Sequence, residues 1–281
     1  MHFLPRNIYV WDAHATPPVN VAGLYQHGAV SVSLFFSWLN MILDIDIPWA
    51  LFPADKEGDP IGEPLDHEDD GTLPFGNYAI CSEDARPIPV SLLRESHRPR
   101  PLTMEATPVT EAEYFRDRVR ARDNRCCVTG IPVQHGDYAT FHASHIFPVV
   151  HKDTWDEKRF KDKIQDDASI ASQGPDGINS IQNGVLLRTD IHDMFNNYDF
   201  GINPDDEYQV IDFTSHGKLH GRSLWINMNV GAKYRPSDAL LRDHLRQCVL
   251  AHVKGQGRRA DWFDFELTDL DPWGKKLLSG H

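Results

Sequence analysis

The stretch ASHIFP, residues 143–148, places His145 on a short apolar segment that ends in a proline. Proline cannot donate to a strand ladder, so the segment is predicted to be a strand that ends there. The preceding stretch CCVTGIPV, residues 126–133, is predicted to be the strand that leads into a turn at Gly130 and pairs with it. A lone histidine in such a hairpin is most often an ordinary core or surface residue.

A second stretch changes that interpretation. QNGVLLRTDIHDMF, residues 182–195, carries Asn183 and His192 nine positions apart and is predicted to be a turn followed by a helix. An asparagine in the turn can use both ends of its amide to bond the backbone and thereby fix where the strand histidine points. The helix histidine His192 can then face His145 across a gap that holds one metal ion and one phosphate.

Taken in order, RCCVTG, ASHIFP and NGVLLRTDIHDMF resemble the HNH endonuclease motif over about residues 125–213. The resemblance implies an α+β fold whose core is a ββα-metal unit, two antiparallel strands and one helix around a single divalent ion. It also implies an enzyme, a metal-dependent endonuclease that hydrolyses phosphodiester bonds in DNA, with RNA as an alternative substrate. Mg²⁺ is the expected ion, with Mn²⁺ or Zn²⁺ as alternatives.

The same resemblance implies the roles of the motif residues. His145 would be the general base, because a neutral imidazole with an ordinary pKa near 6.5 is available at physiological pH. Asn183 would orient His145 from the loop. His192 would bind the metal ion, which would polarise a phosphate oxygen and stabilise the leaving 3′ oxygen.

One position departs from the family pattern. Ser144 stands where many HNH enzymes carry an aspartate or histidine ligand. Residues 142 and 144 share one face of a strand, so His142 is the expected substitute ligand. Asn196, one helical turn after His192, is expected to add a ligand or hold a metal-bound water. Three cations are candidate phosphate contacts, with an ordinary surface role as the alternative for each: Arg188, Arg125 and Lys152.

The charge is distributed unevenly along the 281 residues. The formal net charge is −13, which by itself argues against a nucleic-acid partner. Residues 1–93 carry 3 Lys and Arg against 13 Asp and Glu, so most of the acidity lies there. An arginine-rich stretch follows, FRDRVRARDNR at residues 115–125, which is either a basic face or a solvated, salt-bridged helix.

Proline content and periodicity divide the chain into four parts. We predict a smaller, acidic N-terminal α+β accessory domain at 1–93 and a Pro/Arg-rich linker at 94–109. An HNH nuclease-like domain with helical additions follows at 110–255, and a C-terminal tail at 256–281. Strands are expected within NIYVWDA, PWALFPAD and GNYAICSEDA, and GAVSVSLFFSWLNMILD is expected to start strand-like and continue as a helix.

Helices are predicted at both ends of the HNH region. Thr110 and Glu113 form a capping-box pattern at the start of the first, and Ser237 and Gly255 bracket the last. Both stretches have an apolar face at helical spacing.

The four cysteines include the adjacent pair Cys126 and Cys127, which suits neither a disulfide framework nor a zinc knuckle. A reducing, intracellular compartment is therefore expected, cytoplasm or nucleus. No apolar run is long enough to cross a bilayer and no secretory signal is evident, so no membrane partner is expected. The oligomeric state is not encoded in any pattern that we find.

Two other function classes remain open at this stage. The HNH scaffold could grip nucleic acid or a protein without cleaving, as a binding module. Alternatively, the site could serve a metalloenzyme that acts on a substrate other than nucleic acid, with the acidic N-terminal region shaping a pocket.

Overall fold

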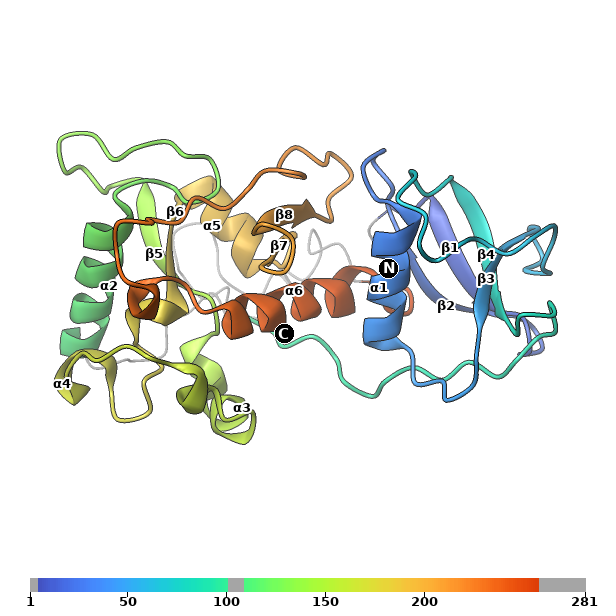
Figure 1. The fold of residues 1–281 in the computed structure, drawn as a ribbon, viewed down its shortest axis with the longest axis horizontal. Coiled ribbons are helices and arrows are strands. Elements are labelled where there is room, and N and C mark those ends of the chain that lie inside the picture. Colours follow the sequence, from blue (N-terminus) through green and yellow to red (C-terminus); the bar gives the residue numbers. More distant parts are fainter. Residues whose placement is uncertain (1–4, 101–108, 258–281) are drawn as a thin grey trace, which may run out of the picture.

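The computed structural model describes residues 5–100 and 109–257, and Figure 1 shows the whole chain. The N-terminal part is a mixed sheet with one helix. Its four strands lie in the order β2-β1-β4-β3, with β1 parallel to β4 and the other pairs antiparallel. The elements are β1 (Ile8–Asp12), β2 (Val19–Leu24), α1 (Val32–Ile42), β3 (Ala50–Ala54) and β4 (Gly76–Cys81).

Helix α1 differs from the predicted strand-like start. The Ser31 side chain accepts a hydrogen bond from the Leu34 backbone N–H at 3.1 Å, so it caps the helix. Phe35 and Leu39 are fully buried one turn apart against the sheet. The strand-like expectation from the alternating apolar residues that begin at Val30 was wrong from Val32 onward. The Ser31 cap and the apolar face at helical spacing favour a helix there.

The second part is built around the antiparallel pair β5 (Phe141–His145) and β6 (Gly184–Arg188), followed directly by α5 (Thr189–Asn196). Helix α2 (Val109–Asp123) packs on the same pair. A second hairpin and a long helix complete it: β7 (Phe200–Asn203), β8 (Gln209–Asp212) and α6 (Asp238–His252). Short helices lie between the main elements: α3 (Lys152–Glu157), α4 (Ile170–Gln173) and the 3-10 turns Val149–His151, Phe160–Lys163, Ile181–Asn183 and Ala232–Tyr234.

The partner of β5 is not the segment that we predicted. Residues 126–133 form a turn that is closed by an isolated β-bridge between Arg125 and Pro132. The Cys127 N–H donates to the Leu186 carbonyl at 2.8 Å. The strand is instead 184–188, which was predicted as part of the turn and helix. Its apolar residues Val185, Leu186 and Leu187 are all fully buried, and a strand covered on both faces does not show alternation.

Helix α6 belongs to both apolar cores, and in Figure 1 it runs between the two parts of the molecule. Leu240 and Leu241 pack with the α2, β5 and β6 side chains. Further along, Cys248 and Val249 pack with the N-terminal sheet and α1. Arg6 donates to the Gly255 carbonyl at 2.5 Å at the end of this helix, which ties the start of the chain to it.

The four cysteines are free and buried, each in the interior of its part of the fold. The arginines of α2 are also engaged rather than gathered into a free basic face. Arg118 pairs with Asp166 through two hydrogen bonds, and Arg120 lies over the Tyr138 ring at 4.6 Å. The structure therefore agrees with the salt-bridged alternative for this stretch. Within 5–100 and 109–257, no helix combines the length and the apolarity that crossing a membrane requires.

Candidate active site

The site is built on the β5–β6 pair, which has α2 and α5 packed against it. Side chains alternate along β5, so His142 and His145, three positions apart, point to opposite faces. The His142 ring lies against His192 of α5, and the His145 ring lies against Phe115 of α2. One strand thus supplies an imidazole to each helix.

On the α5 side, two imidazoles and an amide form one contact set. The His142 and His192 rings stack with their centroids 4.5 Å apart, and Asn196 Nδ2 lies 3.0 Å from His192 Nε2. Burial, followed by the neighbouring His142, lowers the pKa of His192, while Asp193 opposes the shift. His192 is therefore held in the neutral form that can act as a ligand.

On the α2 side, His145 is enclosed. Its ring stacks on Phe115 at a centroid distance of 3.7 Å, and its Nε2 lies 3.0 Å from Asn179 Oδ1. Because an amide oxygen only accepts, this bond assigns the proton to Nε2 and leaves the lone pair on Nδ1. The Asn179 amide in turn donates to Glu111 Oε2 at 2.9 Å, which fixes its orientation.

The environment of His145 disfavours its charged form. Burial lowers the pKa of His145 to about 4, the Arg100 charge adds to the shift, and the bond to Asn179 opposes it. The imidazole is thus neutral across the physiological range, as a general base must be before it accepts a proton.

Asn183 has the backbone-bonding arrangement predicted for it. Its side chain is fully buried, and its Oδ1 accepts from the Phe147 N–H at 2.7 Å. Its Nδ2 donates to the carbonyls of Phe147 and Ile178 at 3.0 and 2.8 Å. Both ends of the amide therefore fasten the segment that follows His145.

The candidate phosphate contacts have side-chain partners of their own, and Lys152 pairs with Asp176. Arg188 pairs with Asp190, with Nε and Oδ1 3.1 Å apart. Arg125 lies over the Trp225 ring at 4.5 Å. Ser144, at the position of the missing acidic ligand, is buried with 3% of its surface exposed.

The structure brings together His142, His192 and Asn196, and places His145 with a different set of partners. Across the described parts of the chain, no contact joins the His145 ring to the His192 ring. The nearest link is Arg100, whose charge acts on both imidazoles.

Sequence reasoning missed four residues of this site: Glu111, Phe115, Asn179 and Arg100. Three of them are far from the motif in the sequence. Asn179 belongs to the stretch INSIQN just before Asn183, and its proximity to the motif is the one signal that could have indicated it.

The donor set fits a divalent ion that accepts nitrogen ligands. His142, His192 and Asn196 offer two imidazoles and one amide oxygen, which suits Zn²⁺ better than Mg²⁺, a cation that prefers oxygen ligands. In the ranges that the structure describes, no cluster of three or more His, Cys, Asp or Glu residues is arranged to hold a metal.

A comparison with protein families identifies the segment that holds these residues. Residues 126–203 match the family model described as HNH endonuclease. The chain contains an HNH domain. This match confirms the resemblance found in the sequence, and the observed mixture of helices and strands confirms the predicted α+β class. Neither the search of curated proteins nor that of solved structures returned a match.

The HNH family indicates a nuclease and implies a nucleic-acid substrate. HNH nucleases typically use a divalent metal ion.

Proposed function

We propose that the chain is a divalent-metal-dependent endonuclease that hydrolyses phosphodiester bonds in DNA. The observation that carries the proposal is the state of His145, a neutral imidazole at the end of β5 with one ring nitrogen bonded to Asn179. A base whose orientation is fixed by a third group is the usual arrangement for activating a nucleophile.

In the proposed reaction, His145 accepts a proton from water through Nδ1, and the water attacks the scissile phosphorus. Asn179 holds the ring through Nε2, and Glu111 holds Asn179. Asn183 bonds the backbone of Phe147, just after β5. These bonds keep the end of the strand, and therefore His145, in a fixed position. Enclosure by Phe115 keeps bulk water away from one face of the ring.

His142, His192 and Asn196 would hold the divalent ion. When bound there, the ion supplies a positive charge that polarises a phosphate oxygen and stabilises the leaving 3′ oxygen. Mg²⁺ is the ion expected from the resemblance, whereas the nitrogen donors favour Zn²⁺, and the test below includes both.

The proposal is tested by incubating supercoiled plasmid DNA with the full chain and Mg²⁺, Mn²⁺ or Zn²⁺ in separate reactions. We expect nicking or linearisation by the wild type, and a loss of roughly 10²-fold or more in His145→Ala, because a positioned base contributes about that much. His216→Ala, a substitution of an exposed histidine, is the matched control. Undiminished cleavage by His145→Ala would remove this residue from the mechanism.

Metal binding is tested separately by calorimetry. His192→Ala should lose most of its affinity for the ion that supports cleavage while its circular dichroism spectrum stays unchanged. Equal affinity in the variant and the wild type would contradict the assignment. A parallel reaction on single-stranded RNA determines whether RNA is also cleaved.

One observation favours the alternative of a non-cleaving binding module. Ser144 replaces the acidic ligand, and the donor set contains no carboxylate. A protein of this kind would bind DNA with a steep dependence on salt but leave plasmid DNA intact with every ion. A metalloenzyme for another substrate would show neither behaviour.

A further inference from the structure

Arg100 reaches the candidate active site from the segment before α2, and none of the roles proposed so far uses it. Its Nη2 donates to the His145 carbonyl at 2.5 Å and its Nη1 to the Ile146 carbonyl at 3.3 Å. The guanidinium also lies over the rings of Phe195 and Tyr198 at 5.3 and 5.7 Å. It thus sits between the end of β5 and the end of α5.

The charge of Arg100 has no counter-ion among the described residues. Its polar partners in the described residues are two carbonyls. The titratable or charged groups that interact with its charge include no carboxylate: Tyr198, Cys248, Arg98, His145, His192 and His244. By contrast, Arg98 pairs with Asp243. Burial lowers the pKa of Arg100, which reflects the cost of a poorly solvated cation. A buried charge without a partner is unfavourable, and an anion that arrives beside it offsets that cost.

The guanidinium also has hydrogen-bonding capacity to spare. Arginine carries five N–H donors, and its hydrogen bonds to described residues, the two carbonyl bonds, use two of them. The cations proposed from the motif itself already have partners: Arg188 pairs with Asp190, Arg125 lies over Trp225, and Lys152 pairs with Asp176.

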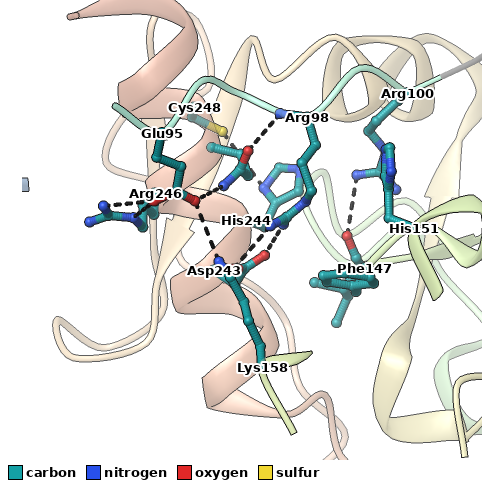
Figure 2. A network of polar contacts seen from close by, with 12 residues as sticks. Glu95, Arg98, Arg100, Phe147, His151, Lys158, Asp243, His244, Arg246 and Cys248 are labelled. Carbon is teal, nitrogen blue, oxygen red and sulfur yellow. Dashed lines mark hydrogen bonds and ion pairs between the residues drawn. The ribbon is translucent and has the colours of Figure 1, made fainter. Parts of the chain in front are cut away.

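The segment that carries Arg100 is fastened to α6, as Figure 2 shows. Glu95 pairs with Arg246, with Oε2 and Nη2 2.8 Å apart, and the Arg98 N–H donates to Gln247 Oε1 at 2.8 Å. Next to Arg100, His151 Nε2 lies 2.6 Å from the Pro99 carbonyl. Arg100 is therefore held in position before a ligand binds, which removes the entropic cost of ordering it at that moment.

We infer that Arg100 is a substrate-contacting residue of the HNH site, whose guanidinium binds a non-bridging oxygen of the scissile phosphodiester. The inference rests on the proposed function and names a residue outside the motif. Guanidinium and phosphate match in geometry and charge, and in a partly desolvated site their attraction is stronger than in water. The same group would stabilise the charge that grows on the phosphate as water attacks.

The first experiment measures binding without cleavage. Full-length wild type, Arg100→Gln and Arg94→Gln are titrated with a fluorescein-labelled DNA duplex in EDTA, at several salt concentrations. Loss of one phosphate contact should reduce the slope of log K against log salt by about 0.9. Arg94 is an exposed arginine of the same segment, and its variant should keep the wild-type slope.

Arg100→Lys guards against a purely structural explanation. It retains the charge and should keep the wild-type slope, although it lacks the planar fork of donors. If Arg100→Lys reduces the slope of log K against log salt as much as Arg100→Gln does, the reduction comes from disturbed structure and the inference is wrong. The inference is equally wrong if Arg100→Gln keeps the wild-type slope, or if the wild type has no affinity for the duplex.

Cleavage is measured second, with the ion that supports the wild type. Arg100→Gln should lower kcat by roughly 10²–10³-fold, the cost of removing one donor to a developing oxyanion. The two proposals fail in different ways. A wild type that binds DNA but never cleaves it contradicts the proposed hydrolysis, and the salt slopes still decide whether Arg100 contacts phosphate.

Discussion

The proton of His145 is held on Nε2 by Asn179, in an environment that resists a second proton. We expect an NMR titration of the folded chain to give His145 a midpoint near pH 4, in line with its lowered pKa. In urea the same imidazole should titrate near pH 6.5, as an exposed histidine does. A folded-state midpoint at or above pH 6 would show that the ring is not enclosed.

The lowered pKa of His145 also makes the free energy of unfolding depend on pH. The unfolded chain binds a proton at His145 below about pH 6.5, whereas the folded chain does so only near pH 4. The neutral His145 ring therefore contributes to the free energy of unfolding at neutral pH, and this contribution is lost as the pH falls from about 6.5 toward 4. The loss is on the order of 1–2 kcal/mol at pH 5, measured by urea unfolding at a series of pH values.

The buried side chain of Asn183 predicts an effect on the stability of the fold. Asn183→Ala removes three hydrogen bonds and leaves polar groups of Phe147 and Ile178 buried without partners. We expect the free energy of unfolding to fall by roughly 3 kcal/mol, about 1 kcal/mol for each bond. Urea unfolding measures it, and the nearby exposed Asp190→Asn is the control. A loss below about 0.5 kcal/mol would contradict the role of a buried fastener.

At this scale, the sequence predicted part of the arrangement of the motif residues. His145, which was expected to face His192, instead lies against Phe115 and Asn179. His142, His192 and Asn196 were expected together and are in contact. Glu111 and Arg100 could not be predicted, because they come from segments whose position depends on tertiary packing and not on local spacing. Their catalytic and binding roles, like those of the motif residues, are proposals.

At the scale of elements, Gly184 sets how closely α2 approaches β6. A Cβ at this position would lie 2.5 Å from Val119 Cγ2 and 2.8 Å from Phe115 Cε2. We expect Gly184→Ala to push α2 away, to destabilise the chain by about 1–3 kcal/mol and to weaken the stacking of Phe115 on His145.

The measurement combines urea unfolding with the His145 titration, because a displaced α2 also exposes the ring and raises its pKa toward the ordinary value. The control is Gly231→Ala, where the nearest atom to an added Cβ is 3.9 Å away. Unchanged stability together with an unchanged midpoint would contradict the close approach.

The elements also show where local patterns mislead. β1, β3 and β4 lie within the predicted strand segments, and α6 lies between the residues predicted to bracket it. β6 was missed because its apolar run is covered on both faces, so neither a period of two nor a helical period identified it correctly. The pairing of β5 with a segment about forty residues away is decided by burial in three dimensions.

At the scale of the whole molecule, α6 contributes side chains to the apolar cores of both parts. We propose that residues 1–93 are an accessory domain whose folding is coupled to the HNH domain, since Cys248 and Val249 of α6 complete its core. We expect thermal unfolding of the full chain to follow one transition, with circular dichroism and tryptophan fluorescence giving the same midpoint.

Val249→Ala tests this coupling, because the residue is fully buried against the N-terminal part. It should lower the single midpoint for both probes, by an amount that corresponds to about 1–3 kcal/mol. Two separate transitions, of which only one responds to the substitution, would show that the parts fold independently.

The buried thiols provide a way to follow that process without a label. Cys81 lies in the N-terminal sheet, Cys127 beside β6 and Cys248 in the shared helix, and burial raises the pKa of each. Thiolates are the species that react with alkylating reagents, so each buried thiol reacts only after its own region unfolds. Mass spectrometry after brief alkylation would thus record, one cysteine at a time, the order in which this protein comes apart.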